Sequence, residues 1–199
     1  MMSKAVLISI RPELVEKIAN EIKTVEVRRT KPHLDTPFKC YIYCTNTKPF
    51  LVWGDVFRGD WCTEFTRLSG YGRVEADSIW DVFNGHVAGE FTCDRVEAIK
   101  AVTEPYGIYD VDDDFVKQTG LVDGALWDYG KGATLYGWHI SKLEIYDTPK
   151  VLSKFRRICD KGCRCEGCAR YWGNGGNCGI GSLRIKRPPQ SWCYVEELK

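Results

Sequence analysis

The chain has 199 residues, within the range of a single compact domain, and 44% of them are hydrophobic, which is enough for a sizeable core. Its 28 lysines and arginines nearly balance 27 aspartates and glutamates, giving a formal net charge of +1. This balance excludes a protein whose overall field drives tight nonspecific binding to polyphosphate, so any nucleic-acid contact must be a local patch. The apolar run at residues 5–10 is too short for a signal sequence or a membrane span, so we expect one cytoplasmic domain over residues 1–199.

The first elements along the chain are predicted to be a strand and a helix. The apolar run at residues 5–10 is typical of a buried strand. After Arg11 and Pro12, apolar residues recur at helical spacing, namely Leu14, Val15, Ile18 and Ile22. The pattern therefore predicts a strand that leads directly into an amphipathic helix.

A strand with one polar face follows this helix. Residues 24–28 alternate strictly with a period of two. The alternation places Val25 and Val27 on one face of the strand, and Thr24, Glu26 and Arg28 on the other. A further strand is predicted at residues 38–44, and we expect it to be central and to pair with residues 24–28 across a short connection.

The rest of the chain predicts three strands, two short helices and two insertions. The strands are expected at residues 87–96, 135–145 and 191–195, and the helices near residues 110–116 and 123–129. Residues 45–85 carry glycines, aromatic residues and charges without sustained periodicity, which indicates an insertion with short strands. Residues 159–181 are rich in glycine and cysteine and form a second insertion.

The strand, the helix and the following segment NEIKTVEVRR resemble the ASCH domains, members of the PUA-like superfamily, whose helix is followed by a G-x-K-x-x-E-x-R pattern. Three residues match K-x-x-E-x-R, namely Lys23, Glu26 and Arg28. The resemblance continues through residues 89–96 and 136–149, and it departs at Glu21-Ile22, where the family has a glycine near the helix end. It implies an α+β fold, a PUA-like mixed β-barrel with flanking short helices, to which this chain adds a cysteine-rich C-terminal insertion.

The matched residues predict a site for a nucleic acid. Lys23, Glu26 and Arg28 offer a cation, an acceptor and a planar donor fork, a set that suits a base edge beside a phosphate. Arg29 and Lys31 add positive charge next to this strand face. The alternative from spacing alone is a surface ion pair of Glu26 with Arg28, worth about 0–1 kcal/mol. The resemblance favours a site, and the leading hypothesis is binding of RNA or a modified nucleotide.

The alternative hypothesis is a hydrolase. Some ASCH proteins resemble small amidohydrolases that act on acetylated cytidine, with a lysine and a threonine on the equivalent strand and a glutamate elsewhere. In this sequence Glu26 occupies the threonine position, so Thr24 is a replacement for the hydroxyl and Glu90 is the candidate acid. Glu26 as a general base and Lys23 as an oxyanion donor would suit hydrolysis of N-acetylated cytidine or of RNA. A factor that binds a protein partner is a third hypothesis.

Clustered cysteines predict a structural zinc site in the second insertion. Their spacing is irregular, and they are Cys159, Cys163, Cys165, Cys168 and Cys178. Four thiolates would complete a closed tetrahedral site and stabilise a glycine-rich segment that has no core of its own. Five cysteines compete for four places, and reduced thiols or a redox pair are the alternatives. The dispersed cysteines elsewhere are expected to be small apolar residues of strands.

Overall fold

The structure, a computed structural model, describes residues 3–48, 52–53, 61–62, 81–102, 107–122, 124–158 and 183–198. Within the expected insertion at residues 45–85 it describes three two-residue strands, β4 (Val52–Trp53), β5 (Trp61–Cys62) and β6 (Asp81–Val82). They pair in the order β5-β4-β6, in agreement with the short strands expected there.

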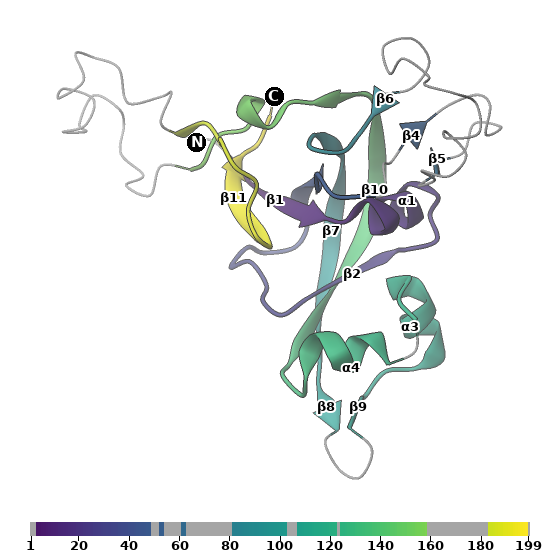
Figure 1. Ribbon diagram of the computed structural model, residues 1–199. Helices are drawn as coiled ribbons and strands as arrows, with labels where there is room; N and C mark the ends of the chain where they lie inside the picture. The colour runs from purple at the N-terminus through teal and green to yellow at the C-terminus, as the bar shows by residue number, and fades with distance from the viewer. Residues whose placement is uncertain are drawn as a thin grey trace, which may run out of the picture.

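Six strands form the main sheet in the order β11-β1-β3-β7-β10-β2 (Figure 1). Their bounds are β1 (Lys4–Ile10), β2 (Val25–Arg28), β3 (Phe38–Cys44), β7 (Val87–Ile99), β10 (Leu135–Lys150) and β11 (Trp192–Glu196). Strands β1 and β3 pair in parallel, and all other neighbours in this sheet are antiparallel. The sheet is therefore mixed, each predicted strand is present in it, and β3 is central as expected.

Short helices flank the sheet, which confirms the α+β class. They are α1 (Pro12–Ala19), α3 (Asp113–Thr119), α4 (Ala125–Gly130) and the 3-10 turn η2 (Leu152–Lys154). Figure 1 shows α3 and α4 together at the end of the sheet near β2, next to the hairpin of β8 (Ala101–Val102) and β9 (Ile108–Tyr109). Of the helices that the structure describes, none has the length and apolar character needed to cross a membrane.

Local sequence accounts for the start and end of these helices. Proline occupies the first turn of α1, where its missing N–H is not needed, and Val15 and Ile18 bury the apolar face. In α3, the side chain of Asp112 accepts a hydrogen bond from the backbone N–H of Phe115 at 2.7 Å, and Gly120 ends the helix with a φ of 64°. The acidic run before α3 is therefore in part a helix cap.

The predicted pairing between residues 24–28 and residues 38–44 is wrong. Strand β2 pairs with β10, with Glu26 opposite Trp138, whereas β3 lies between β1 and β7. The difference lies in which side chains are buried. The six buried residues of β1 and the six of β3 carry no charge, whereas the four buried residues of β2 include Glu26 and Arg28, so β1 and β3 suit the middle of the sheet. A four-residue strand that carries two charged side chains lies at the end of the sheet.

The sheet curls but does not close into a ring of hydrogen-bonded strands, because β2 and β11 are its two ends. Side chains bridge these ends. Trp192 Nε1 donates to Thr30 Oγ1 at 3.0 Å, and the backbone N–H of His33 donates to the Tyr194 hydroxyl at 2.7 Å. The expected barrel is thus an incompletely closed one, in which side chains of β11 reach the residues that follow β2 across the last gap.

Alternation along the strands gives the sheet two apolar faces. We call the first the inner core, which includes Val6, Ile8, Cys40, Ile42, Phe91 and Trp138. The second is the outer core, which includes Ala5, Leu7, Tyr41, Tyr43, Tyr146 and Phe155. A third cluster packs Val25 and Val27 of β2 against α3 and α4. The valines of β2 therefore face the helices, and Glu26, opposite Trp138, faces the inner core.

Candidate functional site

A left-handed turn joins α1 to β2 and sets the position of Lys23. Glu21 has a φ of 57°, a conformation that favours glycine. The backbone N–H groups of Ile22 and Lys23 both donate to the carbonyl of Lys17, at 2.8 and 2.9 Å. The left-handed residue stands where the ASCH pattern has glycine, and the turn forms here with glutamate, at a cost of about 1 kcal/mol.

Lys23, Glu26 and Arg28 form a cluster that we call the buried ion cluster. Glu26 Oε2 lies 3.2 Å from Lys23 Nζ, and Glu26 Oε1 lies 2.8 Å from Arg28 Nε. The three residues are only 2%, 4% and 9% exposed, respectively. The shared strand face of Glu26 and Arg28 is confirmed, and their ion pair is present, but it lies inside the protein rather than on its surface.

Backbone carbonyls from other elements complete the surroundings of the two cations. Lys23 Nζ donates to Val25 O at 2.7 Å and to Thr119 O, at the end of α3, at 2.6 Å. Arg28 Nη2 donates to Ser9 O of β1 at 2.7 Å. Charges without such partners are costly in an apolar interior. The buried ion cluster therefore ties β2 to α3 and to β1.

Attraction between charges contributes more to this cluster than directional hydrogen bonding. Glu26 Oε2 and Arg28 Nε have no well-aligned hydrogen-bond partner among the described residues, although both are within ion-pair distance. Burial lowers the pKa of Lys23, and the negative charge of Glu26 opposes this shift only in part. Burial acts to raise the pKa of Glu26, but the charges of Lys23 and Arg28 outweigh it, so the Glu26 pKa lies below its ordinary value. Glu26 is therefore a carboxylate at neutral pH.

Thr24 lies at the beginning of this region and is only partly buried. Its backbone N–H donates to Gln118 O, and its carbonyl accepts from the N–H of Ile140, both at 2.9 Å. These bonds hold the chain between α3 and β10. The backbone of Thr24 therefore contacts the end of α3, as the side chain of the neighbouring Lys23 does.

Glu90 is held on the other face of the sheet. Its Oε1 accepts from Lys39 Nζ at 2.6 Å, and its Oε2 accepts from the Tyr146 hydroxyl at 2.5 Å. Its chain neighbour Phe91 belongs to the inner core, so Glu90 points toward the outer core. The side chains of Glu26 and Glu90 therefore point to opposite faces of the sheet, and the structure does not bring Glu90 together with Lys23 and Glu26.

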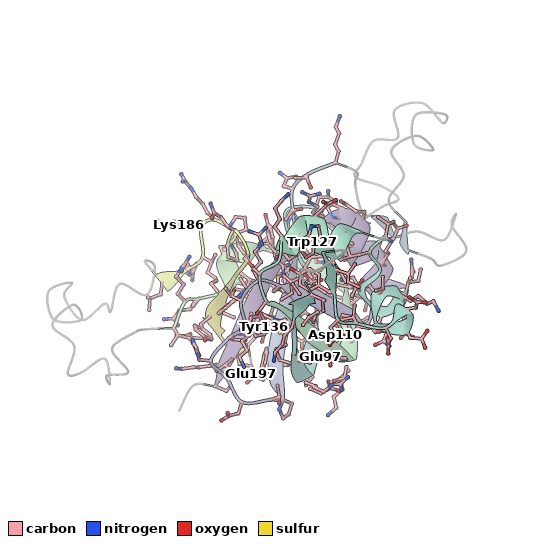
Figure 2. All side chains as sticks on the ribbon, turned by 90° about the horizontal axis from the view of Figure 1, so that it is seen from below. Glu97, Asp110, Trp127, Tyr136, Lys186 and Glu197 are labelled. Carbon is pink, nitrogen blue, oxygen red and sulfur yellow. The ribbon has the colours of Figure 1, made fainter. Side chains whose placement is uncertain are left out.

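The two remaining candidates, Arg29 and Lys31, are exposed and lie against aromatic rings. The Arg29 guanidinium is 5.2 Å from the ring centre of Tyr129, and its Nε donates to Tyr129 O at 2.9 Å. Lys31 Nζ is 5.6 Å from the ring centre of Tyr136, which is labelled in Figure 2. We call Arg29, Lys31, Tyr129 and Tyr136 the cation–aromatic surface. The sequence did not indicate that these two tyrosines contact the cations, because both lie far from them in the chain. Tyr129, for example, is 100 residues from Arg29.

The five clustered cysteines predicted to bind zinc lie outside the described residues, as does the whole of the insertion at residues 159–181. Within the part of the chain that the structure describes, no group of three or more metal-binding side chains comes together. Cys40, Cys44 and Cys93 are free and buried in strands, as expected for small apolar residues. Burial raises the pKa of Cys44 and of Cys93 to about 12, so both are neutral thiols.

Comparison with known proteins gave matches only among solved structures, since no family model and no curated protein matches the chain. The crystal structure of ASCH from Zymomonas mobilis is 15% identical with a TM-score of 0.47, and the match covers 97% of this chain and 88% of that one. A tyrosine-to-phenylalanine variant of the same protein is 16% identical, with a TM-score of 0.47 and coverage of 98% and 92%. A serine-to-alanine variant is 15% identical, with a TM-score of 0.47 and coverage of 97% and 89%.

Proposed function

We propose that the protein binds RNA or a modified nucleotide through the cation–aromatic surface at the end of β2. The observation that carries this proposal is the pairing of two exposed cations with two tyrosine rings, Arg29 with Tyr129 and Lys31 with Tyr136. Arginine and lysine attract phosphates, and aromatic rings provide faces on which unpaired bases stack. A single-stranded RNA that crosses this surface would find cations for its phosphates and aromatic rings for its bases.

The buried ion cluster supports this surface by holding β2 in place. Arg29 directly follows β2, so the direction of its side chain depends on the position of that strand. The strand is short and lies at one end of the sheet, where only β10 pairs with it. The bonds of Lys23 to Thr119 O and of Arg28 to Ser9 O supply the attachment that a second neighbouring strand would otherwise give. A pre-positioned surface loses less entropy on binding.

Binding is better supported than hydrolysis. A hydrolase of N-acetylated cytidine or of RNA would need Lys23 and Glu26 in contact with its substrate, whereas these residues are 2% and 4% exposed. The acid that such a reaction would use, Glu90, is engaged by Lys39 and Tyr146 on the outer-core side.

The number of cations in the proposed surface gives the expected strength of the electrostatic contribution. Arg29 and Lys31 would contact two phosphates, and each such contact on a single strand contributes about −0.7 to the slope of log K against log salt. Between about 50 and 200 mM salt the affinity should therefore fall about sevenfold. A net charge of +1 adds little beyond this local contribution.

The test is fluorescence anisotropy with short single-stranded RNAs at these two salt concentrations. The double variant Arg29→Ala/Lys31→Ala should bind about tenfold more weakly at low salt and should lose most of the salt dependence. Tyr129→Ala should weaken binding without changing the salt slope, because it removes stacking but no charge. Lys117→Ala, which removes an exposed lysine of α3, is the matched control and should bind as the native protein does. Unchanged affinity in the double variant, or no saturable binding by the native protein, would contradict the proposal.

A further inference from the structure

A pocket that is wide open to solvent, which we call the cavity, has a volume of about 450 Å³ and lies apart from the buried ion cluster and the cation–aromatic surface. It is lined by three lysines, two acids and an apolar wall, which include Lys4, Lys39, Lys142, Asp35, Glu197 and Phe38. Its volume is within the range of small-molecule sites, which combine an apolar wall with a few convergent polar groups. None of the residues that line it belongs to the buried ion cluster or to the cation–aromatic surface.

Two of the three lysines in this cavity are available to a ligand. Lys39 Nζ is held by Glu90 Oε1 at 2.6 Å and is 3.8 Å from Oε1 of Glu197, which is labelled in Figure 2. Lys4 and Lys142, in contrast, form no ion pair with any residue in the described part of the chain. Both are exposed at the mouth of the cavity. Both ammonium groups are therefore open to a bound anion, which either of them attracts.

Lys142 is also held in an unusual backbone conformation. Its φ is 47°, in the left-handed region, although it lies within the long strand β10. The register between β10 and β7 shifts at this point, between the pair Ser141–Thr92 and the pair Glu144–Glu90. Bulges of this kind redirect a side chain, and strained residues gather at ligand sites. A glycine would adopt this conformation more readily, but it would not place an ammonium group at the cavity.

From these observations we infer that the cavity binds a phosphomonoester with a hydroxylated and partly apolar body, the chemistry of a nucleoside 5′-monophosphate. The phosphate carries a charge of about −1.5 to −2 at neutral pH, which matches the two unpaired ammonium groups of Lys4 and Lys142. Asp35 accepts hydrogen bonds from sugar hydroxyls, and the wall that includes Phe38 contacts the apolar face of the base. This site goes beyond the RNA surface proposed above and does not depend on it.

A free nucleotide and the 5′-phosphate end of an RNA share this chemistry. The segment between β2 and β3 carries Lys31 of the cation–aromatic surface and, four positions later, Asp35 of the cavity. Four residues of extended chain span at most about 14 Å, the length of a few nucleotides. The two sources of the phosphate therefore have to be distinguished by experiment.

The first experiment is isothermal titration of the full chain with adenosine 5′-monophosphate and, as a control, adenosine. Saturable binding of the monophosphate, at least about tenfold tighter than that of adenosine, is the expected result. Lys142→Gly removes the ammonium group and relieves the backbone conformation, so it should bind at least about tenfold more weakly while its melting temperature does not fall. Lys117→Ala should bind the monophosphate normally. Equal affinity of Lys142→Gly and the native protein, or equal affinity for the monophosphate and adenosine, would overturn the inference.

The second experiment compares a short RNA with and without a 5′-phosphate. If the cavity receives the RNA end, the 5′-phosphate should tighten binding about tenfold, and Lys142→Gly should abolish that gain. If it receives a free nucleotide, both RNAs should bind equally and the monophosphate should still require Lys142. The variant Arg29→Ala/Lys31→Ala separates the two proposals. If that variant binds RNA normally while Lys142→Gly loses the monophosphate, the RNA surface is refuted and the cavity site stands.

Discussion

Glu26→Gln removes the one negative charge of the buried ion cluster, leaves its two cations and keeps the shape of the side chain. In the native protein the Glu26 carboxylate is 3.2 Å from Lys23 Nζ and 2.8 Å from Arg28 Nε. Loss of one partner from a buried ion pair typically lowers the free energy of unfolding by about 3–5 kcal/mol, because a buried charge is left uncompensated. Lys23 and Arg28 both keep backbone carbonyl acceptors. We therefore expect a loss in the lower part of this range, about 3 kcal/mol.

The chain provides a matched control on α3. Asp114 and Lys117 form an ion pair with the same spacing of three residues and a similar distance, 3.0 Å. Their side chains are 81% and 75% exposed, whereas those of Glu26 and Lys23 are 5% and 1% exposed. Water and salt screen the exposed pair. Asp114→Asn should therefore leave the free energy of unfolding unchanged within experimental error.

Urea unfolding followed by tryptophan fluorescence measures both variants. With a slope of about 1–3 kcal/mol per molar urea, Glu26→Gln should lower the midpoint by about 1–3 M. The double variant Lys23→Met/Glu26→Gln should have a free energy of unfolding at least about 1 kcal/mol higher than that of Glu26→Gln. The reason is that it also removes a cation that has lost its carboxylate. A loss below about 1 kcal/mol in Glu26→Gln, close to that of the control, would refute the reasoning and would mean that water reaches the cluster.

Four further predictions follow from single features of the chain. Glu21→Gly should raise the free energy of unfolding by about 1 kcal/mol in urea unfolding, because the φ of 57° at this position favours glycine. Because the folded-state pKa of Glu26 lies below its ordinary value of 4.5, its contribution is present above pH 4.5 and should disappear as the pH falls through the folded-state pKa, which a pH series of thermal melts would detect. Gly89→Ala should destabilise the fold by about 1–3 kcal/mol, because an added Cβ would overlap the carbonyl oxygen of Glu144, and a native midpoint would contradict this packing. We also propose that the cysteine-rich insertion holds zinc, so elemental analysis should find about one zinc per chain and less in Cys165→Ser, and metal-free protein would refute it.

Several parts of the fold could be predicted because their signals are local. The apolar run of β1, the helical spacing in α1 and the period-two alternation of β2 are each read within about ten residues. The same alternation correctly separated Val25 and Val27 from Glu26 and Arg28. The glycine expected at the end of α1 likewise corresponds to a backbone requirement, the left-handed turn at Glu21.

The pairing of strands was not local, and it is where prediction failed. Chain proximity suggested that β2 pairs with β3, but β3, whose buried residues are all uncharged, lies between β1 and β7. Strand β2 then joins β10, more than 100 residues later in the chain. A rule based on short connections cannot predict which strands become neighbours. The choice of neighbours depends on how the side chains of all the strands pack at the same time.

The sequence alone determined which residues are charged and which strand face carries them, whereas the tertiary structure decided whether water reaches them. Lys23, Glu26 and Arg28 read as a polar face open to a ligand, yet Thr119 O, 96 residues away, and Ser9 O enclose the cations. Arg29, one residue after Arg28, stays exposed even though the ring of Tyr129 on α4 lies against one side of it. Exposure depends on elements that are distant in the chain and close in space, and no local pattern encodes their approach.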